Sequence, residues 1–276
     1  MKRALLALVP LLVMAPHMIP APDQKVEGRP PPPPAQTLDD PGRLPDAARM
    51  EQLARTDPVA FLQYCILRHD REVKGYSATM QKQERIDGRL EKKEVIETHY
   101  KVEPHSVFLR WREGQRLAAR ALYVAGQNDG QVVIKPAGLG SFLKSVTRDP
   151  EGPDARRSGR YTLKEFGLRM ALARTLGSWQ AAQKDGTLHV EYGGKVKVKE
   201  AGDRECYKLH RTKFAKPEGD GSTDLTMYVD VETWLPLGTV LKGEDGRLIG
   251  EYYFRDLRLN PEFARDQFTP AAVTAK

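Results

Sequence analysis

The period of the sequence changes at Gly75-Tyr76-Ser77-Ala78-Thr79-Met80-Gln81-Lys82-Gln83-Glu84-Arg85-Ile86. Before this segment apolar residues recur every three to four positions. Within it they alternate, with Tyr76, Ala78 and Met80 on one side. Strict alternation is typical of a β-strand with one buried face. Asp87-Gly88 follows directly and is a strong hairpin signal. The segment therefore predicts the first strand of an antiparallel sheet.

Further alternating segments follow on the C-terminal side and are separated by short turns. Short connections of this kind favour antiparallel neighbours in a meander. Glu84, Glu97 and Arg110 are expected to form cross-strand ion pairs on the polar face of this sheet. The predicted strands cover residues 76–86, 94–102, 106–112, 120–125, 131–135, 187–192, 195–199, 205–212, 224–230, 235–242 and 248–257.

Two helices are predicted on the N-terminal side of this segment. The first covers residues 46–55. Asp57 is a suitable N-cap and Pro58 fits the first helical position, so a second helix begins there. It is expected to end near Gly75, a residue type favoured just after a helix.

A third helix is predicted in the middle of the chain. Thr162 and Glu165 form a capping box, and the apolar residues that follow extend the helix to about residue 183. About 11 strands and three helices indicate an α+β fold. We expect a strongly curved antiparallel sheet, a half-open β-barrel, with helices as a lid.

The N-terminus has the features of an export signal. Lys2 and Arg3 precede an apolar run over residues 4–15, which is much shorter than the about 20 residues needed to span a bilayer. Residues 1–21 are therefore predicted to be a signal peptide that directs the chain to the periplasm or another extracytoplasmic space. An uncleaved N-terminal tether is the alternative.

A proline-rich segment follows the signal. Residues 30–34 are five consecutive prolines, which favour an extended polyproline II conformation. Residues 22–43 are predicted to be a disordered spacer, with a recognition peptide as the alternative. Residues 44–276 show no second change of composition and no internal repeat, so we expect one domain.

Charge and cysteine content limit the class of protein. The formal net charge is +7, from 44 Lys and Arg against 37 Asp and Glu. This mixed surface lacks the basic stripe of a nucleic-acid-binding protein, and export makes such a partner implausible. Cys65 and Cys206 permit one disulfide outside the cytoplasm, or two buried free thiols.

Local motifs for chemistry are absent from the sequence. The histidines and cysteines have no spacing typical of a zinc site, and there is no G-x-S-x-G motif or phosphate-binding loop. No carboxylate pair stands out for glycoside hydrolysis. We therefore expect no catalytic residues, no metal and no cofactor, and predict that the protein is not an enzyme.

The most informative feature is a surplus of large apolar side chains on the curved strands. A concave sheet that helices cover only in part leaves a cavity for an apolar ligand, and methionines make such a pocket adaptable. The alternative is a plain packed core. Residues that face one interior include Tyr228 and Phe254, and the ten that we expect to contact a ligand are Met80, Tyr100, Leu109, Trp111, Tyr123, Phe142, Phe166, Met170, Met227 and Tyr252.

Several stretches resemble an uncharacterised family of secreted bacterial proteins, domain-of-unknown-function family 1571. The resemblance extends over nearly all of the chain after the spacer and implies no established activity. The stretches that carry it are residues 75–85 (GYSATMQKQER), 105–111 (HSVFLRW), 121–130 (ALYVAGQNDG) and 250–260 (GEYYFRDLRLN).

More distantly, the layout is similar to the LolA/LolB lipoprotein carriers and RseB-type sensor domains. Tyr228-Val229-Asp230, Thr233-Trp234-Leu235-Pro236 and Phe268 carry this resemblance. It implies a half-open barrel that binds acyl chains. We therefore predict a protein that binds a lipid or lipoprotein acyl chain, with residues 138–143 and 163–179 as a movable lid. The alternative is an envelope sensor that binds a membrane or envelope protein and has a filled barrel.

Overall fold

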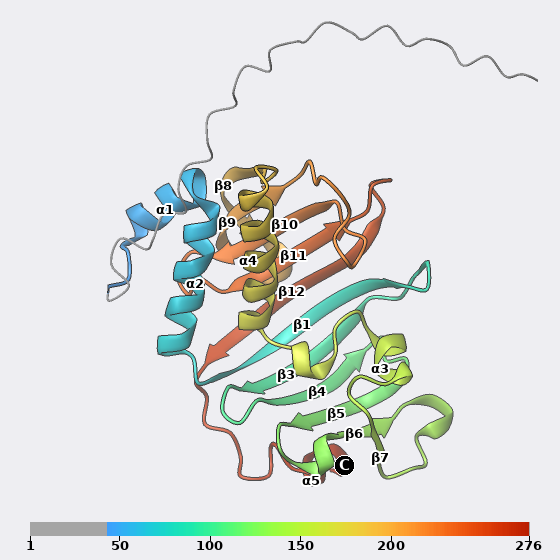
Figure 1. Cartoon of the computed structure of the whole chain (residues 1–276). Helices are drawn as coiled ribbons and strands as arrows, with labels where there is room; N and C mark the ends of the chain where they lie inside the picture. Colours follow the sequence, from blue (N-terminus) through green and yellow to red (C-terminus); the bar gives the residue numbers. More distant parts are fainter. Residues whose placement is uncertain (1–42, 276) are drawn as a thin grey trace, which may run out of the picture. The chain divides into compact units, whose positions relative to one another are not determined.

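The computed structural model describes residues 43–275, which form one antiparallel sheet with most of the helices on its concave face (Figure 1). The last helix, residues 270–274, packs on the opposite face against Phe108, Leu122 and Val133. The predicted signal peptide and all but the last residue of the predicted spacer lie outside the described residues. The 12 strands run in the order β7-β6-β5-β4-β3-β1-β12-β11-β10-β9-β8, and β2 pairs with β1 alone. Among the described residues β7 and β8 are the two edges and do not pair, so the curved sheet is half-open, as predicted.

The strands are β1 (Gly75–Ile86), β2 (Arg89–Leu90), β3 (Glu94–Lys101), β4 (Ser106–Glu113), β5 (Ala118–Val124), β6 (Val132–Pro136), β7 (Val146–Arg148), β8 (Val190–Val198), β9 (Arg204–Arg211), β10 (Asp224–Asp230), β11 (Pro236–Lys242) and β12 (Leu248–Leu259). The helices are α1 (Ala47–Thr56), α2 (Pro58–Glu72), α3 (Pro153–Ser158), α4 (Leu168–Lys184) and α5 (Pro270–Thr274). None of the helices between residues 43 and 275 is long and apolar enough to cross a membrane.

Strand β1 is the centre of the sheet. Every second residue from Tyr76 to Ile86 is buried, as the alternation predicts. β1 pairs with β3 on one side and with β12 on the other, where Met80 lies opposite Ile96 and Phe254. It thereby joins two meanders, one from each half of the chain.

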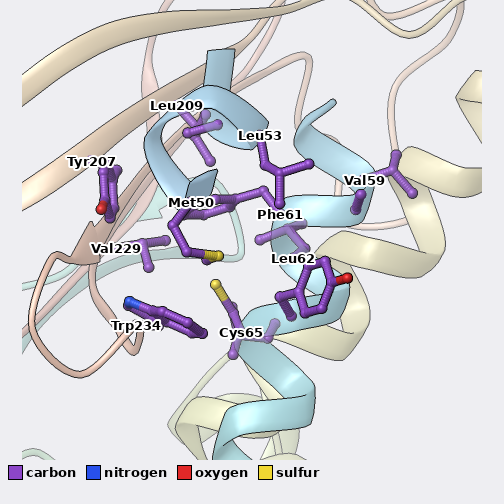
Figure 2. Packing of buried hydrophobic residues seen from close by; sticks show 14 of the residues in the cluster. Met50, Leu53, Val59, Phe61, Leu62, Cys65, Tyr207, Leu209, Val229 and Trp234 are labelled. Atoms are coloured by element: carbon purple, nitrogen blue, oxygen red, sulfur yellow. The ribbon is translucent and has the colours of Figure 1, made fainter. Parts of the chain in front are cut away.

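Helices α1, α2 and α4 cover the half of the sheet that contains β8 to β12, where α2 and α4 lie side by side (Figure 1). Asp46 and Asp57 cap α1 and α2 by accepting hydrogen bonds from the N–H groups of Arg49 and Ala60. Met50 and Cys65 point toward Trp234 in the core between these helices and the sheet (Figure 2). Burial of the apolar faces of the helices holds them on the sheet.

The third predicted helix is interrupted. Thr162 and Glu165 do form the capping box, but it closes only the short 3-10 turn Leu163–Glu165. Gly167 then adopts φ +132°, a conformation that ends any helix, and α4 begins at Leu168. A Cβ at Gly167 would lie 3.2 Å from the Tyr100 ring, so both the backbone and the close approach require glycine here.

Other boundaries also differ from the predictions. The two strands expected at residues 187–192 and 195–199 are one strand, β8, with an irregularity between Tyr192 and Lys195. Gly194 at φ +80° accommodates it. The short elements β2, β7, α3 and α5 were not predicted, because two to six residues are too few to show a period.

Cys65 and Cys206 are both buried free thiols. Of the two predicted alternatives, a disulfide or two free thiols, the structure has the free thiols. Cys65 lies in the core beneath α1 and α2, and Cys206 lies in the core around β1. Burial raises the pKa of the Cys65 thiol far above its usual range and that of Cys206 to about 12. Neither thiol is therefore ionised near neutral pH.

We expect neither thiol to react with Ellman's reagent in the folded protein, because the thiolate is the reactive form and both groups are buried. In denaturant without reductant both thiols should react, and reductant should leave the thermal midpoint unchanged. The measurement is thiol titration before and after unfolding. A result of no thiols in denaturant would contradict the structure.

Candidate functional site

A cavity of about 560 Å³ lies between the concave face of the sheet and the segments that cover it. Strands from both meanders form its floor. Helix α4 and the segments at residues 146–167 and 214–222 form its cover. Its volume is within the range of small-molecule sites, and most of its lining is apolar.

Six of the ten residues expected to contact a ligand line this cavity, and they come from five different elements or segments. These are Met80 of β1, Leu109 and Trp111 of β4, Phe166 before α4, Met227 of β10 and Tyr252 of β12. Antiparallel pairing and a common side-chain parity bring the five strand residues together on one face, and Phe166 reaches the cavity from the segment before α4. The shared face is what the alternation predicts.

The other four expected residues do not line the cavity. Tyr100 is buried and stacks on Tyr76, with ring centroids 4.9 Å apart. Tyr123 is buried in a small cluster with Ala121 and Val132. Met170 is half-buried on α4, and Phe142 is the most exposed large apolar side chain among the described residues. Whether any of the ten contacts a ligand stays a prediction.

A buried charged cluster lies in the cavity wall among these apolar residues. Lys82 Nζ donates to Glu84 Oε2 at 2.9 Å and lies 3.7 Å from Glu94 Oε2. Tyr252 donates its hydroxyl to Glu84 Oε1 at 2.6 Å, and Trp111 donates Nε1–H to Glu94 Oε2 at 2.6 Å. All five side chains line the cavity. We call Lys82, Glu84 and Glu94 the charged triad.

Hydrogen bonds and charge fix the protonation of this cluster. Burial raises the pKa of Glu84, but the Lys82 ammonium and the hydrogen bonds from Lys82, Tyr252 and the Arg160 N–H lower it more. The net pKa therefore lies below the usual value. Burial and the Glu84 charge raise the pKa of Tyr252 well above its usual value. Glu84 is thus a carboxylate and Tyr252 a hydrogen-bond donor near neutral pH.

The sequence reasoning placed Glu84 on the wrong face. Glu97 and Arg110 do approach each other across β3 and β4, at 4.0 Å on the partly exposed outer surface. Glu84 instead lies inside with Lys82, because both share the parity of Met80. That parity was visible in the sequence. Two charged residues in register with apolar ones signal a buried pair.

The triad brings two carboxylates to one ammonium, and the lowered pKa of Glu84 is opposite to what a general acid requires. A glycosidase needs one carboxylic acid whose pKa is raised, so that it can donate a proton to the leaving group. Here Lys82 contacts both carboxylates and the pKa of Glu84 is lowered. The three groups hold one another in place in the cavity wall, which fits a structural or ligand-orienting role.

The cover of the cavity has a firm part and a loosely attached part. Leu172 and Trp179 hold α4 in the core and are fully buried. Within residues 149–167, Pro150 is the one buried residue, and its neighbours are half-buried or exposed. Any opening of the cover therefore costs less at residues 149–167 than at α4, since less apolar surface must be exposed.

An open antiparallel barrel with a helix-covered, mostly apolar cavity defines a class of fold rather than one protein. Within that class the sequence identifies the family. Residues 73–275 match the proteins of unknown function designated DUF1571, and the chain belongs to this family. No curated protein matches the sequence.

Several solved structures have a similar fold. The crystal structure of MucB matches with a TM-score of 0.47 and 20% identity over 78% of this chain, which spans 63% of the MucB chain. The lipoprotein LppX of Mycobacterium tuberculosis matches at 0.42 with 9% identity, over 75% of this chain and 99% of LppX. A LolA-superfamily protein from Nitrosomonas europaea matches at 0.33 with 10% identity, over 75% and 97% of the two chains.

Proposed function

We propose that this protein is a non-enzymatic binding protein that takes an acyl chain of a lipid or lipoprotein into the cavity. The supporting observation is the cavity of about 560 Å³ with its apolar floor of strand residues. Each buried methylene contributes about 0.8 kcal/mol, so ten of them offset about 8 kcal/mol of ordering and desolvation costs. An acyl chain supplies such a row of methylenes.

The predicted signal peptide at residues 1–21 supports a site of action outside the cytoplasm. Acyl ligands are abundant at the membranes of that compartment. The spacer at residues 22–43 then separates the domain from a membrane or wall if the signal is retained.

The second candidate is an envelope sensor that binds protein through its surface and needs no ligand. That reading requires a filled barrel, and the cavity supports the first proposal over it. The charged triad is compatible with both, because it stabilises the wall and also offers polar groups to a ligand. The two candidates differ in whether lipid occupies the protein.

We expect Ile134→Trp to weaken binding of a fluorescent fatty acid at least about ten-fold, since loss of two contacts worth about 0.8 kcal/mol each is sufficient. Ile134 lines the cavity and is half-buried, so the indole fills the space that the ligand needs. Arg110→Trp is the control, because Arg110 lies on the outer face between Leu109 and Trp111. Equal affinities for both variants would contradict the proposal.

Native mass spectrometry of protein purified from its own membranes tests the same idea without a probe. We expect a bound species with the mass of an acyl lipid, lost in Ile134→Trp and kept in Arg110→Trp. If no lipid co-purifies and no fatty acid is displaced, the ligand-free sensor is favoured instead. A pull-down with the full chain then identifies its protein partner.

A further inference from the structure

We propose that one end of the sheet docks onto an anionic lipid surface through an apolar rim formed by Leu90, Leu117, Phe142 and Leu143. These are the four large apolar side chains that are exposed among the described residues, at 39%, 51%, 81% and 40%. Single exposed apolar residues are ordinary, but four at one place indicate a contact surface.

Topology brings the four residues to the same end. Leu90 follows β1, Leu117 follows β4, and Phe142 and Leu143 follow β6. Because β1, β3, β4, β5 and β6 are consecutive antiparallel neighbours, the C-terminal ends of β1, β4 and β6 lie at one end of the sheet. The connections after these three strands therefore form one surface, although they are up to 53 residues apart, from 90 to 143.

The most exposed part of the rim has a fixed shape. Lys135 Nζ donates to the carbonyl oxygens of Ser141 and Leu143 at 2.9 and 2.6 Å. The Leu143 N–H donates to the Gly140 carbonyl at 3.1 Å, and the Ala137 N–H donates to the Leu117 carbonyl at 3.1 Å. These bonds hold Phe142 outward, so little entropy is lost when it enters a lipid interface.

The rim carries positive charge that complements an anionic membrane. The three connecting segments, residues 87–93, 114–117 and 137–144, contain five Lys and Arg against two Asp and Glu, a net +3. Arg89, Lys92, Lys93 and Lys144 are exposed. Apolar residues surrounded by basic ones are the pattern of an interfacial lipid contact, because the rings enter the interface and the charges attract anionic head groups.

The cavity extends toward this end of the sheet. Leu117 itself lines it, together with Arg116, Pro136 and Glu94, all at the ends of strands that reach the rim. Docking through the rim therefore places the cavity beside the lipid. This surface goes beyond the proposed function, since vesicle binding requires no ligand in the cavity.

Flotation of the full chain with phosphatidylcholine vesicles, with and without phosphatidylglycerol, tests the proposal. We expect binding to the anionic vesicles that falls with salt and falls at least about ten-fold in Phe142→Asp. Gln127→Asp is the matched control, because it adds the same charge at an exposed position at the other end of β5. All variants share the N-terminal segment, so any contribution of that segment to vesicle binding cancels when the variants are compared.

Two further measurements separate the outcomes. In Phe142→Trp, the added fluorescence should shift to shorter wavelength and be quenched by brominated lipid. Equal vesicle binding by Phe142→Asp and Gln127→Asp, or no quenching, overturns the proposal. So does sedimentation showing that Phe142 instead mediates self-association. Ile134→Trp, which fills the cavity and leaves the rim unchanged, should still float with anionic vesicles, so failure here and failure of the proposed function are distinguishable.

Discussion

Replacing Lys82 with methionine should lower the free energy of unfolding by about 3–5 kcal/mol, because removal of one partner leaves buried charge uncompensated. The side chains of Lys82, Glu84 and Glu94 are only 11%, 5% and 6% exposed, and Lys82 contacts both carboxylates. The measurement is urea unfolding at neutral pH. Methionine keeps most of the volume of the lysine stem, so lost charge is the main change.

Lys93→Met is the control for this prediction. Lys93 pairs with Glu251 at 3.3 Å, but its side chain is 48% exposed. Exposed pairs contribute about 0–1 kcal/mol, so we expect a small change. If the two variants lose equal stability, the triad is not an electrostatic unit.

The dependence of this effect on pH has a definite sign. The folded pKa of Glu84 is below the usual 4.5, so its contribution is present above pH 4.5 and is lost as pH falls through the folded value. Without Lys82, burial raises the pKa of Glu84, and protonation relieves the cost. The stability difference between wild type and Lys82→Met should therefore begin to shrink above pH 4.5, as pH falls through the raised pKa of the variant, and should continue to shrink until pH reaches the lowered pKa of the wild type. A difference that stays constant from neutral to acidic pH contradicts this account.

Replacing Trp179 with alanine should destabilise the protein by about 3–5 kcal/mol. Trp179 is fully buried on α4, in the core cluster that includes Met50, Phe61 and Cys65 (Figure 2 shows part of this cluster). The indole is one of the contacts that hold α4 against α2 and the sheet. Its removal leaves a cavity that the surrounding helices fill only in part.

Gln180→Ala is the matched control on the same helix, because Gln180 is exposed and its truncation should change stability by less than about 0.5 kcal/mol. Chemical unfolding and amide exchange of α4 measure the effect. A loss below about 1 kcal/mol in Trp179→Ala would mean that α4 is not anchored and can move as a lid. That result would support the helical part of the lid predicted at residues 138–143 and 163–179.

The predictable part of the fold is the part with a clear period or a cap. The alternation from Tyr76 to Ile86 gave β1, and Asp46 and Asp57 gave the starts of α1 and α2. Where two local signals competed, the prediction was wrong: the capping box at Thr162 is real, yet Gly167 ends the helical path. The contact of Gly167 with Tyr100 spans 67 positions of sequence, from 100 to 167, and no local pattern shows it.

The sequence predicted a mostly apolar cavity on the concave face, but only some of the residues that line it. Five of the six expected residues that line the cavity lie on strands, where side-chain parity assigns the faces. Tyr100 and Tyr123 share that parity but lie beside other buried side chains, which a single strand cannot reveal. The charged triad was missed because charged residues were assigned to the solvent face by type, although Lys82 and Glu84 alternate with Met80.

By itself the sequence determined an antiparallel, half-open sheet with helices as its cover, because side-chain period and caps are local properties of the backbone. Only the tertiary structure decided that β1 pairs with β12. The two strands are at least 162 positions apart in the sequence, from residue 86 to residue 248, and their pairing joins the two meanders around one cavity. It also decided that the charged triad is buried and that the three connections carrying the four exposed apolar residues lie at one end of the sheet. These features depend on which strands become neighbours, and that choice is made by the packing of the whole chain.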